Sequence, residues 1–250
     1  MPERDIGAVV AVMDARMAVV PAERAAQRLF LQTYRRTTVA VGTAIGAARF
    51  EEPDWVERWD VAFAELYLAA LDRDLSGRAD VPQPWRLAFD APASLPALRH
   101  VLLGINAHIN YDLPQALLAV ISDDEFADPA ALARHRRDHE RIDGVLSRRV
   151  AAEDDELGSI STRSLLDRLL QPVNRFSSRR FLREARQKVW HNTIELQRAR
   201  LAGEQSYDAR LAELEVLSAA RIADLLTSGQ ILLRLAVAGF GVTLPPARAT

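Results

Sequence analysis

The sequence predicts an all-α fold, a single helical domain of about eight or nine helices around a buried central helix over residues 95–122. Apolar residues recur at helical spacing in almost every segment, and no alternating or β-branched run is long enough for a strand. The stretch 95–122 is apolar on nearly every side, which is typical of a helix at the centre of a domain. The 250 residues, 49% of them hydrophobic, are enough for one large core.

Prolines and glycines mark the ends of the predicted helices. Pro21, Pro53 and Pro129 each stand at a first-turn position, where the missing N–H of proline removes no helical hydrogen bond. Beside the central helix, the predicted helices cover residues 6–20, 21–50, 53–75, 129–152, 162–170, 178–201 and 207–238, the last with Gly229 as a candidate break.

The proline-rich segment 80–96 is the longest irregular stretch in the front half of the chain. Trp85, Leu87 and Phe89 give it an apolar anchor that a flexible linker would lack. We therefore expect a loop that lies over the core, and its length and aromatic residues make it a candidate lid.

Composition and charge narrow the function classes. The net charge of −2 gives no global attraction to nucleic acid or to an anionic membrane, so neither is an expected partner. The absence of cysteine excludes disulfides and thiolate sites. The first residues lack the pattern of a signal peptide, and the apolar stretch 231–244, interrupted by Arg234, is shorter than the ~20 residues of a membrane span. We expect a cytoplasmic protein in which residues 231–244 form a docked terminal helix. Only one of the 32 basic residues is lysine, and alanine is frequent, which suggests the coding bias of a GC-rich bacterial genome.

The central helix carries the strongest candidate site. His108 and Asp112 are four residues apart, so they share one face of the helix, and that face coincides with its densest apolar stripe. Polar groups in such a place must be hydrogen-bonded, paired or metal-bound. Pro114 removes the hydrogen bond to the carbonyl of Asn110 and predicts a kink beside the pair.

The helix over 129–152 repeats the pattern, with His135, His139 and Asp143 on or beside its apolar face. If it packs against the central helix as an antiparallel hairpin folded near residue 125, His139 comes level with Asp112 and Asp143 with His108. Such ligands on facing helices form zinc, iron or manganese sites in helical bundles. His135 is flanked by arginines and is the member most easily assigned to the surface.

Three interpretations of these residues stay open: a metal site, a metal-free acid–base or ligand pocket, and structural polar contacts. His191 and Glu195 form another pair four residues apart, but the helical wheel places His191 away from the apolar face and favours the surface. The sequence has no phosphate-binding glycine loop and no dinucleotide motif, so no nucleotide cofactor is indicated.

The segment LLGINAHINYDLP, residues 102–114, resembles a bacterial family of helical proteins classed as domain-of-unknown-function family 5995, which carries a similar Asn-Ala-His-Ile-Asn-x-Asp-Leu signature. WRLAFDA (85–91) and FEEPDWVERWDVAFAELYL (50–68) extend the resemblance over most of the front half, and it continues more loosely to the end. The family implies no activity. Its signature singles out Asn106, His108, Asn110 and Asp112.

A more distant similarity is to the zinc-dependent phospholipase C and P1-type nuclease group, which is all-helical and uses a His-x3-Asp pair followed by Gln-Pro. Here His108 and Asp112 are followed by Leu-Pro-Gln. The chain departs from that group because it has no processed N-terminal tryptophan and too few well-placed histidines for a three-zinc cluster.

These observations favour a metal-dependent enzyme, with a hydrolase preferred. The predicted metal ligands are His108, Asp112, His139 and Asp143, and the predicted catalytic residues are His108, Asp112, Asn106 and Asn110. Two alternatives remain: a non-enzymatic protein that binds a small molecule or uses these residues structurally, and a non-haem iron oxygenase that uses His108, Asp112 and His139. The substrate and the oligomeric state do not follow from the sequence.

Overall fold

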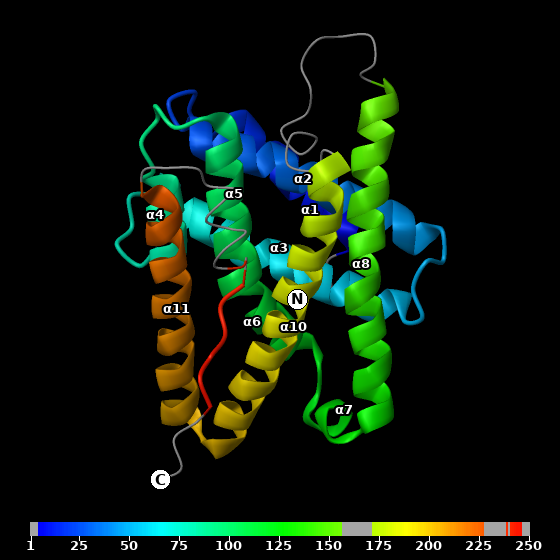
Figure 1. The fold of residues 1–250 in the computed structure, drawn as a ribbon. Helices are drawn as coiled ribbons and strands as arrows, with labels where there is room; N and C mark the ends of the chain where they lie inside the picture. The colour runs from blue at the N-terminus through cyan, green and yellow to red at the C-terminus, as the bar shows by residue number, and fades with distance from the viewer. Residues whose placement is uncertain (1–4, 157–171, 228–238, 240, 247–250) are drawn as a thin grey trace.

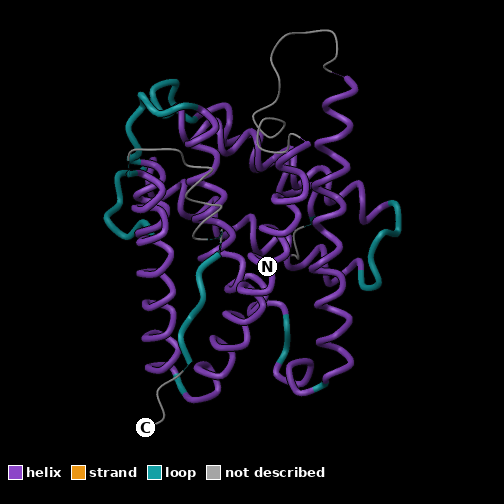
Figure 2. Tube along the Cα trace, in the orientation of Figure 1, coloured by secondary structure: helices purple, strands orange, loops and turns teal. Residues whose placement is uncertain are grey.

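The computed structural model describes residues 5–156, 172–227, 239 and 241–246, and within these ranges the chain forms helices and loops without a strand (Figures 1 and 2). The predicted all-α fold is confirmed. The helices in chain order are α1 (Ile6–Val19), α2 (Ala25–Gly46), α3 (Pro53–Leu75), α4 (Gln83–Phe89), α5 (Ala97–Ala107), the π-helix η1 (His108–Asp112), α6 (Leu113–Val120), α7 (Asp123–Ala127), α8 (Pro129–Glu156), α10 (Pro172–Ala202) and α11 (Glu204–Leu226).

The predicted central helix is one continuous rod divided into α5, η1 and α6 (Figure 1). Pro114 has no N–H to donate to Asn110, and Leu113 donates its N–H to the carbonyl of His108, five residues earlier. The proline therefore interrupts the α-helical pattern through a π-helical turn, a rare element that is frequent at functional sites. Because a π-turn inserts an extra residue, it changes the direction of every side chain it carries.

The apolar core surrounds this rod. α5 packs on α2 and α4, whereas α6 lies between α3 and α10. At Gly104 a Cβ atom would come within 2.3 Å of the Phe30 ring, so the close approach of α2 to α5 requires glycine there. The largest fully buried side chains include Trp55, Tyr67 and Trp85, from α3 and α4.

The segment 80–96 is not the irregular loop that we expected, because residues 83–89 form α4. Pro82 and Pro84 open this short helix, where the lack of an N–H is tolerated. Its predicted apolar anchor is confirmed, since Trp85 is fully buried. The lid role stays a prediction.

The expected hairpin does not form: among the described elements, α8 makes no extensive contact with α5, η1 or α6. α8 packs against α10, α2 and α7, while α6 is flanked by α3 and α10. The short helix α7, capped by Ser122, lengthens the connection, so α8 returns on the far side of α3 and α10 rather than directly against α6 (Figure 1).

The end of the chain also differs from the prediction. Residues 241–246 are extended rather than helical and lie along α10 and α11 (Figure 2). Most of the predicted terminal helix 231–244 and all of the predicted helix 162–170 lie outside the described residues. In the described portion of the chain, no helix combines the length and the apolar character needed to span a membrane.

Candidate functional site

His108 is held by one of its two ring nitrogens. Its Nδ1 lies 2.8 Å from Asp112 Oδ2, and the indole N–H of Trp85 donates to the same oxygen at 2.8 Å. Because an indole nitrogen can only donate, Asp112 Oδ2 accepts the hydrogen bond from Trp85. We infer that Oδ2 also accepts the hydrogen bond from His108, and we therefore place the proton of the neutral imidazole on Nδ1. This tautomer leaves a lone pair on Nε2, which has no hydrogen-bond partner.

Aromatic rings surround the His108 imidazole. The Phe63 ring stacks on it with centroids 3.4 Å apart and an interplanar angle of 4°, and Tyr34 approaches edge-on at 4.4 Å. The rings of Phe30, Tyr67 and Trp85 also contact the imidazole. Burial lowers the pKa of His108 well below its usual value, so the imidazole is neutral at pH 7.

The carboxyl of Asp112 is equally enclosed. Burial raises its pKa well above the usual value, and the hydrogen bond from Trp85 opposes part of that rise. His108 and Asp112 thus form the close pair that the sequence predicts, and Trp85, from the expected loop, is a third member that sequence reasoning did not connect to them.

Unpartnered polar atoms gather around this pair. The Tyr67 hydroxyl, His108 Nε2 and Asp60 Oδ2 are buried without a hydrogen bond. The Tyr34 hydroxyl makes no hydrogen bond of good geometry either, although the Thr38 side chain lies close enough to lower its pKa slightly against the effect of burial. Asp60 lies close enough to Tyr34 for its carboxylate to raise the pKa of the tyrosine, which burial already places well above 10. Each unpaired buried polar atom costs about 1–3 kcal/mol, so such a group is unusual unless an ordered water or a ligand satisfies it.

Asp60 is the site residue that sequence reasoning missed. It is 3% exposed on α3, and burial raises the pKa of its carboxyl to about 8, with a further contribution from Glu57. The signal was present in the sequence: Val56, Phe63 and Ala64 stand four residues before, three after and four after it, which places Asp60 on the apolar face of the helix.

Asn106 and Asn110 lie on the same rod and are both buried. Asn106 donates to the Leu102 carbonyl at 2.9 Å and accepts from Asn110 at 3.3 Å. The carbonyl oxygen of the Asn110 side chain accepts from the backbone of Val242. These two residues therefore connect the central helix to the C-terminal segment, and their predicted role in orienting substrate stays a prediction.

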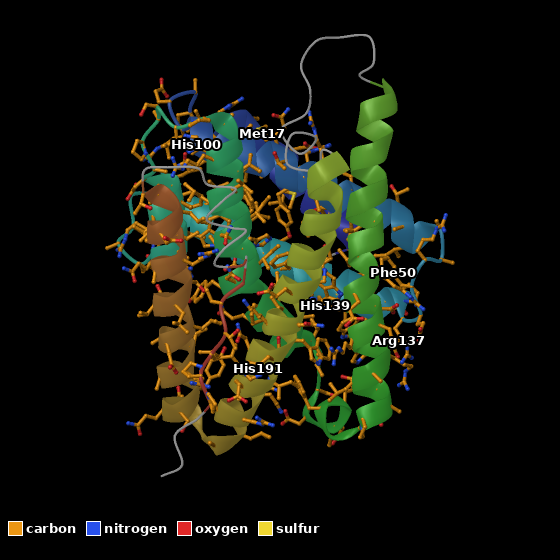
Figure 3. The ribbon with its side chains drawn as sticks, in the orientation of Figure 1. Met17, Phe50, His100, Arg137, His139 and His191 are labelled. Atoms are coloured by element: carbon orange, nitrogen blue, oxygen red, sulfur yellow. The ribbon has the colours of Figure 1, made fainter. Side chains whose placement is uncertain are left out.

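His139 belongs to a different set of rings. It is buried between Trp59 and Trp190, with centroids 6.2 and 5.8 Å away, on the side where α8 meets α10 (Figure 3). Burial lowers its pKa well below the usual value, and Arg186 and Arg136 lower it further. The described residues contain no group of three or more His, Asp or Glu side chains placed to hold a metal ion. The side chain of Asp143 lies outside the described residues, so the four-ligand metal site stays a prediction.

His135 is not a surface residue, although arginines flank it. Its side chain is 3% exposed, stacks on Trp55 at 4.2 Å, and places Nδ1 2.6 Å from Glu52 and Nε2 3.3 Å from Glu125. These two glutamates lie at the beginning of α3 and in α7, so His135 is buried by other elements. The helical pattern of α8 alone does not predict this burial.

His191 is exposed, as the helical wheel predicts, and its Nε2 donates to the carbonyl of Leu244 (Figure 3). Glu195, the other member of this pair, is buried. It is 4% exposed and pairs with Arg198 and with Arg210, which α11 brings over this face of α10.

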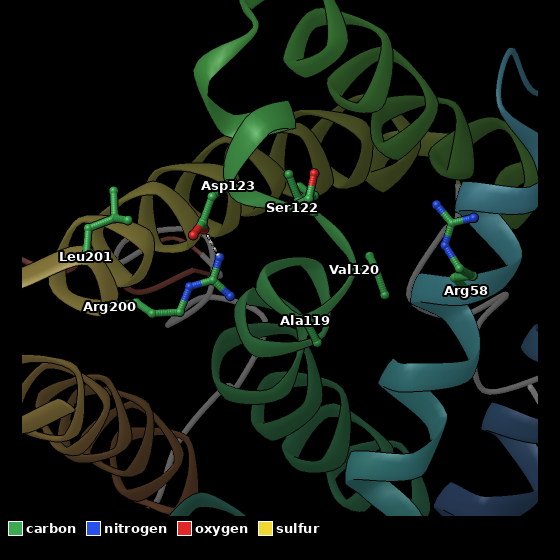
Figure 4. A pocket seen from close by; sticks show the side chains of 8 residues that line it. Arg58, Ala119, Val120, Ser122, Asp123, Arg200 and Leu201 are labelled. Atoms are coloured by element: carbon green, nitrogen blue, oxygen red, sulfur yellow. Dashed lines mark hydrogen bonds and ion pairs between the residues drawn. The ribbon is translucent and has the colours of Figure 1, made fainter. Parts of the chain in front are cut away.

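A surface pocket of about 610 Å³ opens at the other end of α6 (Figure 4). It is lined by Arg58, residues 119–123, Arg200 and Leu201, and Arg200 pairs with Asp123 at its edge. None of the predicted site residues lines this pocket, so it is separate from the His108 cluster.

The comparisons with known proteins give one match. A family model described as a family of unknown function, DUF5995, matches residues 6–228, which include His108, Asp112, Trp85 and Asp60. Neither the curated proteins nor the solved structures contain a match to this chain. The resemblance read from residues 102–114 is confirmed, and the chain belongs to this family of unknown function.

Proposed function

We propose that this protein is an enzyme, with hydrolysis as the favoured reaction, in which His108 acts as a general base. The observation that carries the proposal is the lone pair on His108 Nε2, buried and without a partner, while Asp112 fixes the opposite nitrogen. A neutral histidine oriented by a carboxyl group is a common general base at neutral pH. Nε2 would take the proton of the attacking water or hydroxyl.

The neighbouring groups suit a substrate in which negative charge develops on oxygen. Tyr34, Tyr67 and protonated Asp60 each offer an O–H without a present acceptor. Neutral donors held in an apolar site stabilise an oxyanion more strongly than water does, because they need no reorganisation. A carboxylic acid kept neutral at pH 7 is one such donor. We assign Asp60 and Tyr34 to the oxyanion and Asp112 to the orientation of the base.

Access requires movement, because His108 is only 3% exposed. A substrate reaches Nε2 when one of the covering elements opens, and α4 is one such element since Trp85 caps the pair.

A metal-dependent form of this enzyme is a second candidate, favoured by the Nε2 atoms of His108 and His139, both of which lack a hydrogen-bond partner. A bound divalent ion would lower the pKa of a coordinated water and supply the nucleophile. His108 through Nε2 is the residue best placed to bind it, since its Nδ1 is already engaged.

The test is a substrate screen with purified wild-type protein and His108→Gln, using chromogenic esters, phosphate monoesters and diesters, and amides. We expect turnover of one class that falls at least 100-fold in the variant, with the circular dichroism spectrum unchanged. Elemental analysis by plasma mass spectrometry separates the two forms: near-stoichiometric metal in wild type that is lost in the variant supports the metal-dependent one. Turnover that is equal in both proteins would refute a role for His108.

A further inference from the structure

The C-terminal segment, residues 241–246, lies between α10 and α11 and is in contact with η1 (Figure 1). We call the surface of α10, α11 and η1 that the segment covers the groove. Gly241 and Leu244 are buried, whereas Thr243 and Pro245 face solvent. The segment is extended, so its backbone N–H and C=O groups find no partners within the segment itself and must bond to the groove.

The side chains of two asparagines form hydrogen bonds with this backbone, as the main chain of a neighbouring β-strand would. Asn192 donates to the Val242 carbonyl at 3.0 Å and accepts from the Leu244 N–H at 2.9 Å. In a parallel β-sheet, one residue bonds in the same way to the two residues that flank its partner on the neighbouring strand. Here the Asn192 side chain takes the place of that residue, and Val242 and Leu244 are the two flanking residues. Asn110, from η1, accepts from the Val242 N–H at 3.2 Å. The main chain of Val242 is thus satisfied entirely by side-chain amides of the groove.

The other hydrogen bonds between the groove and the described part of the segment also end on main-chain atoms. Lys188 donates to the Gly241 carbonyl and His191 to that of Leu244, each at 3.1 Å. Arg210, from α11, donates to the carbonyl of Pro245, and Arg221 donates to that of Gly239, ahead of the segment. The groove therefore binds an extended chain largely without regard to its side chains.

Two positions do select the side chain. Leu244 is fully buried in an apolar cluster with Tyr111, Leu118, Leu196 and Leu214. At Gly241 a Cβ atom would lie 3.2 Å from the Cα of Ala185 and 2.9 Å from the Cδ of Lys188, so a larger residue would push the segment off α10. A glycine and a leucine three residues apart are what the groove requires.

We propose that this groove is a binding site for an extended peptide with glycine and leucine three residues apart, and that residues 241–246 of the chain are its exchangeable occupant. Backbone hydrogen bonds that give affinity, with pockets for a few side chains, are the general mode of extended-peptide recognition. The groove residues Asn110, Asn192 and Arg210 lie inside the family match, which ends at residue 228, and the segment comes after it. The family match therefore covers the groove residues and not the segment that occupies the groove. This proposal is independent of the chemistry at His108.

The experiment uses the full chain carrying Leu244→Asp, which removes the buried leucine and frees the groove. A fluorescent synthetic peptide of residues 241–246 is titrated with this protein and followed by anisotropy. We expect saturable binding, and at least tenfold weaker binding to the wild-type chain, because the tethered segment competes at a high effective concentration.

Matched controls define the site. A peptide with Leu244→Asp should bind at least tenfold more weakly, whereas a peptide with Thr243→Ala, changed at an exposed position, should bind as tightly as the original. Adding Asn192→Ala to the Leu244→Asp chain should also reduce binding at least tenfold.

Three outcomes would overturn the proposal. One is a folded Leu244→Asp chain that does not bind the peptide, and another is equal binding of the two leucine and aspartate peptides. If Leu244→Asp does not fold, Gly241→Val replaces it. Loss of folding in both variants, judged by circular dichroism, would make the segment an integral part of the fold instead of an exchangeable ligand.

Discussion

Two buried histidines in this protein lie in similar surroundings but differ in the group that faces their second ring nitrogen. His108 stacks on Phe63, and His135 stacks on Trp55. Both ring nitrogens of His135 face carboxylates: Nε2 hydrogen-bonds to Glu125, and Nδ1 lies 2.6 Å from Glu52 Oε2 as an ion-pair contact without hydrogen-bond geometry. His108 Nδ1 hydrogen-bonds to Asp112, and no carboxylate pairs with its Nε2. Burial and aromatic contact alone therefore do not distinguish a structural histidine from a candidate catalytic one. A buried nitrogen that faces no carboxylate is the feature that we link to function, and His139 Nε2 shares it with His108 Nε2.

The largest effect should be on the pH dependence of the activity found by screening. His108 is a base while neutral, and burial lowers its pKa, so the acid limb of kcat/KM should lie below pH 6.5. The pKa of Asp60 is about 8, so a limb that falls with rising pH should appear near that value. Asp60→Asn should lower kcat/KM by about 100-fold and remove the alkaline limb. An alkaline limb that persists in the variant would exclude Asp60 as its source.

The second prediction concerns the free energy of unfolding of Asp60→Asn. The folded protein keeps the Asp60 proton up to about pH 8, whereas the unfolded chain releases it near its ordinary pKa of 3.8. Between these values the folded state binds more protons, so this group lowers stability as pH rises, by at most ~1.4 kcal/mol per pH unit. Below pH 4 the contribution vanishes.

The variant lacks this titration. Its stability relative to wild type should therefore rise from pH 4 to pH 8, measured by urea unfolding at several pH values. A constant difference across this range would mean that Asp60 is ionised in the folded protein, and it would remove the proton donor from the proposed site.

The third prediction compares the two histidines directly through replacement by phenylalanine, which preserves the stacked ring. In His108→Phe the loss of the bond to Asp112 is offset by the removal of the unpartnered Nε2, and we expect a change within about 1 kcal/mol. In His135→Phe both carboxylate contacts disappear, and we expect a loss of about 1–3 kcal/mol. Glu52 and Glu125 are partly exposed, which keeps this loss moderate. If His108→Phe is the more destabilising of the two variants, the result would favour a structural role for His108 over a catalytic one.

The sequence predicted the helices and the buried pair because both depend on local spacing. His108 and Asp112 are one turn apart, so a helical wheel finds their common face. The bond from Trp85 to Asp112 joins residues 27 positions apart, and the pairing of Asn192 with Val242 joins residues 50 apart. No local pattern reports such contacts.

Two further features differ from what the sequence predicted, each for its own reason. The π-turn at η1 has the same apolar pattern as the α-helix around it, so only the backbone geometry reveals it. The hairpin expectation assumed that consecutive helices pack against each other, but α7 and the insertion of α3 and α10 separate α8 from α6. The missed Asp60, by contrast, had a local signal: one carboxylate among the apolar residues of an otherwise regular helix face.

The smallest expected effect isolates one contact of His135. Glu125 completes a capping box with Ser122 and also meets His135 Nε2 at 3.3 Å. Glutamine serves as well as glutamate in a capping box, so Glu125→Gln should remove only the charge facing the histidine, and the side chain is 34% exposed. We expect a loss of about 0.5 kcal/mol for Glu125→Gln and about 1–1.5 kcal/mol for Glu125→Ala, which loses the cap as well. Thermal or urea unfolding of both variants gives the two values. Equal losses would assign the whole contribution of Glu125 to its contact with His135, whereas no loss in the glutamine variant would leave Glu52 as the carboxylate that holds this ring.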